Sequence, residues 1–209
     1  MLYANSSVGA VFGYTAAFMN AVGLAWYSRD MFFGETITNP VTWWLWLVET
    51  IISLIIYVDR TKDMSKWATE AVSAVGVSII SLFLLFQTLS GEAHSVFETV
   101  ELVDYIAATF AVVALVVWIV TRKTYGAGIA LWVFQLALLS AIFPLMRSAV
   151  VETAVEPLGP WVLWTIAFAF QAICAYLRWD GYEPIVSPIN YTITHGLIAI
   201  TILHSATFS

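Results

Sequence analysis

Charged residues are scarce in this chain. Asp, Glu, Lys and Arg make up 11% of the 209 residues, whereas a soluble globular domain carries about 25%. Hydrophobic residues make up 61%. A chain with so little polar surface cannot keep most of its exterior in water, so we predict an integral membrane protein with the lipid bilayer as its solvent.

Cysteine and basic residues are also few, and each shortage excludes something. Cys174 is the single cysteine, so no intrachain disulfide can form and the redox compartment is not readable. No basic segment precedes the first apolar run, so we expect that run to remain in the mature protein. The net charge is −6 and no basic patch occurs, which argues against a nucleic-acid partner.

The motifs of cofactor, metal and nucleotide chemistry are missing. The lysines all fall at predicted inner span ends, so none can carry retinal as a Schiff base: Lys62, Lys66 and Lys123. The histidines lack the spacing of metal ligands: His94, His195 and His204. No Walker loop or dinucleotide-binding glycine pattern occurs. Ser53, His195 and Glu49 could formally supply a hydrolytic triad, but nothing in their spacing requires it. We therefore expect no enzyme activity, no metal and no cofactor.

Long apolar runs dominate the sequence instead. A helix needs roughly 20 mainly apolar residues to cross the hydrocarbon core. Alternating strand patterns are absent, so helices are the expected spanning structure. Seven segments qualify as spans: 8–28, 38–58, 67–88, 98–121, 125–146, 158–178 and 184–206.

The basic residues predict how these spans are oriented. The positive-inside rule places the side that is richer in Lys and Arg in the cytoplasm. One side holds six basic residues: Arg60, Lys62, Lys66, Arg122, Lys123 and Arg178. The other holds two: Arg29 and Arg147. With seven spans, this predicts a cytoplasmic N-terminus and an external C-terminus, in the inner (plasma) membrane of a prokaryote.

A shift of 118 positions superimposes landmarks of the two halves. Trp43 then falls on Trp161, Trp46 on Trp164, Arg60 on Arg178 and Arg29 on Arg147. The first three spans fall on the last three, and the fourth span is left unpaired. The expected architecture is an all-α membrane protein with parallel repeats in a 3+1+3 arrangement. Its parts are a three-helix repeat at 1–92, a linker helix at 93–123 and a second repeat at 124–209.

This plan resembles the PQ-loop superfamily, which includes the SWEET sugar transporters and the bacterial nicotinamide riboside transporters. The resemblance covers nearly the whole chain as architecture. At the sequence level, two stretches carry it: "AVGLAWYSRDMFFGETITNPVTWWLWL" and "AIFPLMRSAVVETAVEPLGPWVLW". Where the family has a Pro-Gln pair, this chain has Pro144-Leu145 in one half and Trp26-Tyr27 in the other. The chain is also similar to bacterial seven-span proteins with "R-D-x-x-x-G…N-x-V-x-W-x-x-W".

The resemblance implies a substrate site between the halves, near the middle of the membrane. In the family, aromatic and amide side chains contact the substrate there. The residues in comparable places are Trp46, Ser53, Trp164, Gln171 and Asn190. The resemblance implies a fold and a place for the site, but no particular substrate.

Polar residues at membrane depth point to the same region. Glu49 and His195 fall near the middle of their spans, and Asn20 adds an amide at moderate depth. An ionisable group inside a span is costly and usually faces the bundle interior or a cavity. We therefore predict that Glu49 points inward, with a hydrogen-bond partner such as His195, Ser53 or Asn20.

Structural roles for the same residues are open alternatives. Glu49 could hold neighbouring helices together by a hydrogen bond. His195 could be a neutral histidine bonded to a backbone carbonyl or to Glu49. The tryptophan pairs could serve packing alone, and Asn190 could support a kink at Pro188.

The function expected from these patterns is transport of a small polar solute, such as a sugar or a vitamin, by alternating access between the two halves. The alternative is a non-transporting membrane subunit or receptor that binds a partner, lipid or pigment. A water-accessible cavity between the halves favours transport, and a dry, leucine-filled centre favours the subunit. The sequence leaves the substrate and the driving ion open, and it is compatible with a homo-oligomer.

Overall fold

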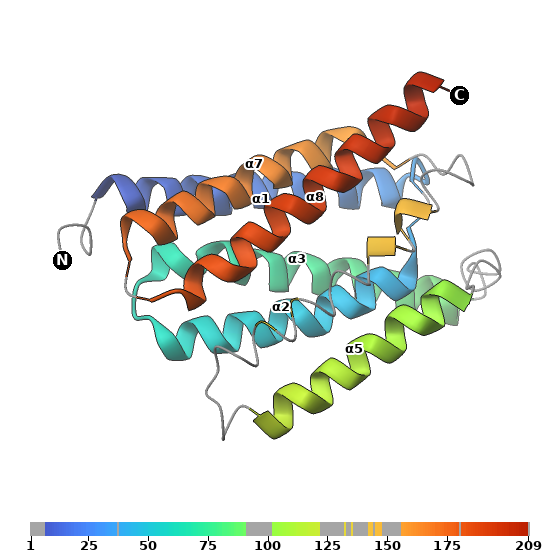
Figure 1. Ribbon diagram of the computed structural model, residues 1–209. Coiled ribbons are helices and arrows are strands. Elements are labelled where there is room, and N and C mark those ends of the chain that lie inside the picture. Colours follow the sequence, from blue (N-terminus) through green and yellow to red (C-terminus); the bar gives the residue numbers. More distant parts are fainter. Residues whose placement is uncertain are drawn as a thin grey trace.

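The computed structural model describes residues 7–36, 38–90, 102–121, 132, 135, 142–143, 145–147, 156–179 and 181–208. Within these residues the regular structure is entirely helical (Figure 1). The helices are α1 (Ser7–Phe32), α2 (Pro40–Arg60), α3 (Met64–Leu89), α5 (Leu102–Thr121), α7 (Leu158–Leu177) and α8 (Glu183–Phe208). The all-helical prediction is confirmed.

Two helices begin where the sequence supplies capping residues. The Asn39 side chain accepts a hydrogen bond from the Thr42 backbone N–H at 3.1 Å, and Pro40 opens α2. The Asp63 side chain accepts one from the Ser65 backbone N–H at 3.2 Å, at the start of α3. Each cap satisfies an N–H group that has no partner within its helix.

Five described helices are long and apolar enough to cross a membrane: α1, α2, α3, α7 and residues 184–207 of α8. Large apolar side chains such as Phe18, Ile55 and Phe86 are exposed on the bundle, whereas Glu49 and Gln171 are fully buried. This distribution is that of a protein solvated by lipid. The prediction of an integral membrane protein is confirmed.

The other two expected spans, 98–121 and 125–146, are not among these five helices. The span at 98–121 corresponds to α5, which has an apolar stretch at 108–117. The span at 125–146 lies outside the described residues, except for a few positions. The number of seven spans therefore stays a prediction, and so does the 3+1+3 repeat.

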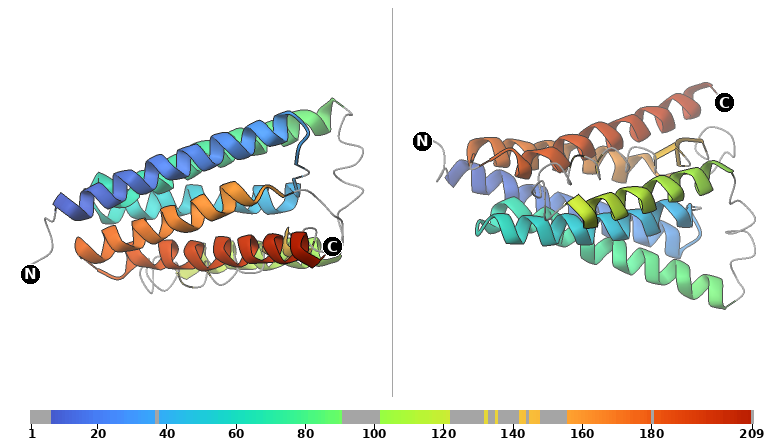
Figure 2. Two further views of the ribbon diagram at one scale, coloured as in Figure 1. Left: turned by 90° about the horizontal axis from the view of Figure 1, so that it is seen from above. Right: turned by 60° about the horizontal axis from the view of Figure 1, so that its bottom comes forward.

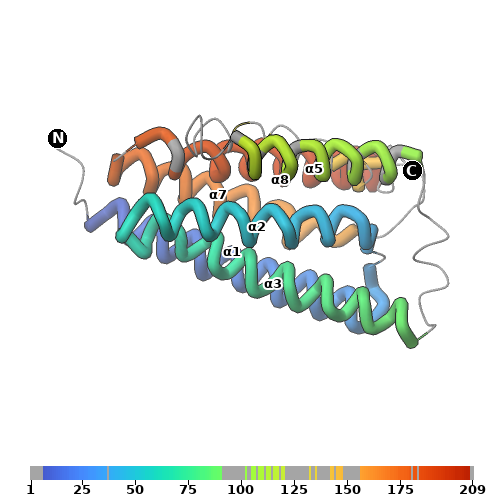
Figure 3. The backbone as a smooth tube through the Cα atoms, turned by 90° about the horizontal axis from the view of Figure 1, so that it is seen from below, coloured from blue at the N-terminus to red at the C-terminus, as the bar shows by residue number. Residues whose placement is uncertain are grey.

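Helix α1 lies between α3 and α7 and packs against both. Helix α3 packs against both α1 and α2, and α7 packs against both α1 and α8 (Figure 2). Helix α2 also contacts α5 and α8 (Figure 3). We call α1–α3 the first group and α7–α8 the second group. The start of α1 and the end of α8 lie at opposite ends of the bundle (Figure 1).

Small residues on α1 allow the two groups to approach closely. A Cβ atom added to Gly13 would lie 2.1 Å from the Ser65 carbonyl oxygen and 2.9 Å from Cys174 Sγ. One added to Gly23 would lie 2.4 Å from Trp164 Nε1. Membrane helices commonly use glycine in this way, because close backbone approach increases the van der Waals contact between them. Helix α1 thus contacts α3 and α7 at the same level of the bundle.

Candidate functional site

An aromatic cluster surrounds His195 near the middle of α8. Five rings lie within 6 Å of the imidazole, measured between ring centroids: Trp46 at 5.6 Å, Trp161 at 5.4 Å, Trp164 at 5.7 Å, Phe168 at 5.2 Å and Tyr191 at 5.8 Å. The Trp46 ring is stacked on the imidazole with an interplanar angle of 24°. Trp46 belongs to the first group and the other four rings to the second, so both groups build this cluster. We call it the aromatic box.

A cavity of about 30 Å³ lies beside the aromatic box. That volume holds about two water molecules. Both groups supply its walls, including the polar residues Asn20, Glu49 and His195 and the tryptophans Trp43, Trp46 and Trp164. The centre of the bundle thus contains a small cavity, whose wall combines aromatic and aliphatic side chains with a few polar ones.

Glu49 projects from α2 into this interior and is fully buried. Its Oε1 accepts a hydrogen bond from the Ser53 hydroxyl at 2.7 Å and one from Gln135 Nε2 at 3.2 Å. The Tyr191 hydroxyl lies within interaction range of the carboxylate. Among the described residues, Glu49 Oε2 and the Tyr191 hydroxyl have no hydrogen bond of normal geometry. Glu49 thus points inward with Ser53 as a partner, and one of its oxygens is left for another ligand.

The His195 ring is held by its own helix. Nδ1 lies 2.8 Å from the Tyr191 carbonyl oxygen. That oxygen can only accept, so Nδ1 carries a proton and Nε2 of the neutral ring is an acceptor. No hydrogen bond joins His195 to Glu49 among the described contacts. This bond to a backbone carbonyl fits the alternative in which His195 is a neutral histidine with a structural role. The same ring also lines the cavity.

Asn20 connects three helices at the cavity wall. Its Nδ2 donates to the Thr69 carbonyl oxygen at 3.1 Å and to Ser73 Oγ at 2.8 Å, both on α3. The backbone carbonyl oxygen of Asn20 accepts a hydrogen bond from Trp164 Nε1 at 3.3 Å. Asn20 therefore ties α1 to both groups, and its amide donors are already in use.

Glu70 is a second buried carboxylate that the sequence analysis did not single out. It lies on α3, is fully buried, and neither of its oxygens has a hydrogen-bond partner among the described residues. Glu49 is its electrostatic neighbour. The available signal was simple, because Glu70 is the only acidic residue in the span at 67–88.

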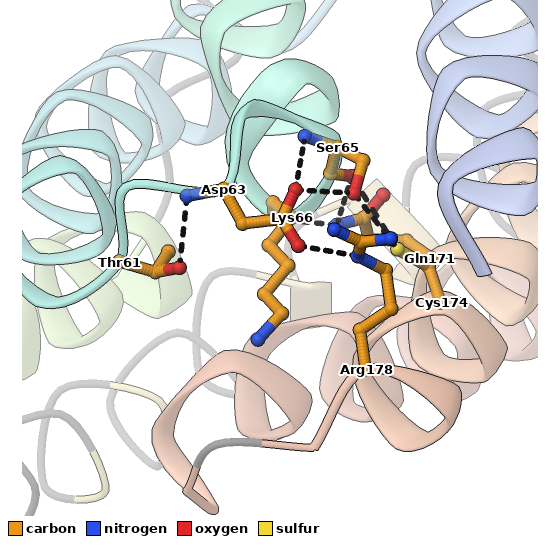
Figure 4. Close-up of polar contacts among 7 residues, drawn as sticks. All are labelled: Thr61, Asp63, Ser65, Lys66, Gln171, Cys174 and Arg178. Carbon is orange, nitrogen blue, oxygen red and sulfur yellow. Dashed lines mark hydrogen bonds and ion pairs between the residues drawn. The ribbon is translucent and has the colours of Figure 1, made fainter. Parts of the chain in front are cut away.

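At one end of the bundle, polar side chains at the end of α7 contact the first turn of α3 (Figure 4). Arg178 Nε forms an ion pair with Asp63 Oδ2. The Ser65 hydroxyl donates to Asp63 Oδ1 at 2.7 Å. Partial burial acts to raise the pKa of Asp63, but hydrogen bonds from Arg178 and Ser65 outweigh it, so the pKa lies below its usual value. We call this contact the Arg178 closure.

Gln171 belongs to the Arg178 closure and not to the cavity. Its Nε2 donates to the Lys66 carbonyl oxygen at 2.5 Å, and its Oε1 accepts from the Thr69 hydroxyl at 2.8 Å. One turn further along α7, Cys174 Sγ lies 3.5 Å from the Ser65 carbonyl oxygen. Side chains of α7 thus bond to backbone and hydroxyl groups over more than one turn of α3.

A second polar contact closes the opposite end. The Tyr27 hydroxyl donates to Glu156 Oε1 at 3.1 Å, and Trp161 Nε1 donates to Glu156 Oε2 at 3.1 Å. Thr38 Oγ1 lies 3.2 Å from the Tyr27 hydroxyl, and the Trp43 ring centroid lies 4.9 Å from that of Tyr27. Burial raises the pKa of Glu156 to about 7, although both hydrogen bonds act to lower it. We call this contact the Glu156 closure.

The structure thus brings five of the eight predicted site residues to one cavity: Asn20, Trp46, Glu49, Trp164 and His195. Ser53 does not line the cavity itself, but its hydroxyl donates a hydrogen bond to Glu49, which does. Asn190 is further away, since its Nδ2 donates at 2.5 Å to Gln135, the residue that bonds to Glu49. Sequence reasoning missed Glu70, Tyr191 and the Glu156 closure.

The described residues contain no group of three His, Cys, Asp or Glu side chains that could hold a metal ion. Comparison with known proteins adds nothing to this, since no protein-family model, curated protein or solved structure matches the chain.

Proposed function

We propose that this protein is a membrane transporter or facilitator for a small solute and works by alternating access. The observation that carries the proposal is the small central cavity, which is built by both helix groups and has a polar contact between the groups on each side of it. A carrier in its occluded state requires this arrangement: a central site, and a separate closure on each side.

The Arg178 closure has the properties of a gate. Its bonds join α3 of the first group to α7 of the second, so separating the groups at this end breaks them. Asp63 and Arg178 are only partly buried, so water can solvate both charges when the gate opens. A partly exposed pair of this kind contributes only about 1 kcal/mol, which permits opening.

The Glu156 closure is the corresponding gate on the other side. Tyr27 of the first group donates to Glu156, which directly precedes α7 of the second group. The same shift of 118 positions that relates the tryptophans also relates Thr38 to Glu156, and both contact the Tyr27 hydroxyl. Opening this gate exposes the carboxylate to water.

The orientation follows from the charges, as part of the same proposal. The Arg178 closure lies at the end that carries Arg60, Lys62 and Lys66, so we assign it to the cytoplasm. The Glu156 closure then faces the outside of a prokaryotic plasma membrane. The chain takes the N-in, C-out topology and the PQ-loop-like architecture that its sequence favours.

Thiol accessibility tests alternating access without knowledge of the substrate. Thr50→Cys and Val77→Cys place thiols on the cavity wall in a Cys174→Ser background, and neither residue makes a hydrogen bond between helices. Right-side-out and inverted vesicles are each treated with a membrane-impermeant methanethiosulfonate. We expect both thiols to react from both sides.

Ile80→Cys is the matched control, because Ile80 lies one turn from Val77 on α3 and is fully buried away from the cavity. It should not react from either side. If Thr50→Cys and Val77→Cys react no faster than this control, the transport proposal fails. The non-transporting subunit would then be the better interpretation.

A further inference from the structure

We infer that the cavity binds a small organic cation, such as a substituted ammonium compound with a hydroxyl group. The inference rests on the proposed function, because it names the class of solute that would occupy the central site. Three features carry it: unpaired acceptors, buried carboxyl groups and aromatic faces.

The acceptors around the cavity are only partly used. Glu49 Oε2 is buried and has no hydrogen-bond partner among the described residues. His195 Nε2 is an acceptor, because Nδ1 donates to the Tyr191 carbonyl oxygen. A buried acceptor without a partner costs about 1–3 kcal/mol, so a donor or a cation at this place is favoured.

The donors, in contrast, are mostly engaged within the protein. Both Asn20 Nδ2 bonds go to α3, Trp164 Nε1 donates to Asn20, and the Thr50 hydroxyl donates to the Leu47 carbonyl oxygen. The Trp43 indole N–H interacts with the Tyr27 hydroxyl, and the Tyr191 hydroxyl interacts with the Glu49 carboxylate, although neither contact has normal hydrogen-bond geometry among the described residues. The Tyr191 hydroxyl can instead donate to a hydroxyl oxygen of the solute. The arrangement suits one oxygen and one positively charged group better than the many hydroxyls of a sugar.

Two carboxyl groups lie beside the cavity. Glu49 lines it, and Glu70 is the electrostatic neighbour of Glu49. Three of the four oxygens of this pair lack a hydrogen-bond partner among the described residues: Glu49 Oε2, Glu70 Oε1 and Glu70 Oε2. Among the residues that the structure describes, no lysine or arginine lines the cavity. A bound cation would stabilise an ionised carboxylate at this place.

Aromatic faces indicate an organic cation rather than a metal ion. Trp43, Trp46 and Trp164 line the cavity together with Phe168 and Tyr191. Aromatic faces attract a substituted ammonium group by cation–π interaction, and the attraction grows when water is excluded. Metal ions need several oxygen, nitrogen or sulfur ligands, and the described residues offer no such cluster.

The closed cavity is too small for such a solute, since about 30 Å³ holds only water. Binding must therefore separate the walls, which lie on α1, α2 and α3 in one group and on α7 and α8 in the other. Solute binding and movement of the two groups are coupled for this geometric reason.

Choline and 3,3-dimethylbutan-1-ol provide the test, because they share a shape and differ in charge. The full-length protein is placed in nanodiscs, and binding is followed by thermal shift and tryptophan fluorescence at constant ionic strength. We expect choline to bind at least tenfold more tightly than the neutral alcohol. Equal binding of the two compounds overturns the inference, as does equal stabilisation by sodium or potassium at the same concentration.

Glu49→Gln tests the residue that carries the charge. The amide oxygen can still accept from Ser53 and Gln135, so we expect the melting temperature to be retained. Choline affinity should fall at least tenfold, while affinity for the neutral alcohol should not change. Glu35→Gln is the control, because it removes the same charge from an exposed side chain that pairs with Arg29. If Glu49→Gln does not fold, Glu70→Gln should show a smaller loss of the same kind. Choline binding that is unchanged in a folded variant refutes the inference.

The outcomes also separate this inference from the transport proposal. The cavity thiols can react from both sides while choline binds no better than its neutral analogue. In that case the transport proposal stands and the cation inference fails. Choline binding can depend on Glu49 while the cavity thiols react from one side only or from neither. In that case the cation inference stands and the transport proposal fails.

Discussion

Replacing Glu156 with glutamine removes the carboxylate of the Glu156 closure and keeps its shape. The amide can fit the same partners. Its oxygen accepts from Trp161 Nε1, its NH₂ group donates to the Tyr27 hydroxyl, and that hydroxyl then donates to Thr38 Oγ1 at 3.2 Å. Tyr27 reverses its role because a phenol can both donate and accept. The variant should therefore fold and keep the closure intact.

The expected effect follows from the raised pKa of Glu156. Its ordinary value is 4.5, and burial raises it to about 7. Below pH 4.5 the group is neutral in both the folded and the unfolded state. As the pH rises, the unfolded chain loses the proton first, so the free energy of unfolding decreases until the pH passes about 7. Between pH 5 and pH 8 this loss amounts to about 2.5 kcal/mol.

Thermal unfolding of the purified protein at pH 5 and pH 8 measures the effect. A loss of about 2.5 kcal/mol corresponds to roughly 5–10 °C in Tm for a chain of this size. We expect this decrease in the wild type and a correspondingly smaller one in Glu156→Gln, since all other titrating groups are shared. The two proteins should differ most at pH 8, where the variant is the more stable. Parallel pH profiles would refute the assigned burial and pairing of Glu156.

Three further predictions concern the closure at the other end, the helix contacts and the topology. Arg178→Ala should destabilise the protein by about 1 kcal/mol and raise thiol labelling of the cavity from the cytoplasmic side; unchanged labelling would show that Arg178 gates nothing. Gly13→Ala should lower the free energy of unfolding by about 1–3 kcal/mol, because the added methyl group overpacks against Ser65. In Gly196→Ala the added methyl group would lie 3.5 Å from its nearest neighbour, so this variant should be neutral or stabilising by up to about 1 kcal/mol. Equal melting temperatures of the two variants would contradict the close contact at Gly13. A C-terminal alkaline phosphatase fusion should be active, and a C-terminal reporter that works only in the cytoplasm would reverse the topology.

Much of the fold follows from elementary constraints on the sequence. A membrane span has a required length, and an ionisable group inside one has a high cost, so the helices and the inward direction of Glu49 are predictable from single segments. Trp46 and Trp164 were expected at one site because they hold equivalent positions in two segments of similar pattern, and both rings lie within 6 Å of His195.

Other features depend on how helices pack, which single segments do not specify. Gln171 lies seven residues beyond Trp164, about 10 Å along the helix axis, and this distance places it at the Arg178 closure and not at the cavity. Glu70 is near the end of its span, where a carboxylate is usually solvated. It is buried because α3 packs against three other helices, α1, α2 and α7. The Glu156 closure joins residues 129 positions apart in the chain, a contact that no local pattern indicates.

The close packing of tryptophans around His195 has an optical consequence. The ring centroids of Trp46 on α2 and Trp161 on α7 are 5.7 Å apart, and those of Trp43 and Trp164 are 6.4 Å apart. Indole rings at such separations couple their electronic transitions, and the coupling gives paired circular dichroism bands of opposite sign. A rearrangement of the two helix groups changes the distances between Trp46 and the rings of α7, and therefore the intensity of these bands. The protein thus carries an intrinsic spectroscopic reporter of its own conformation, which can be read without a label and without knowing the solute.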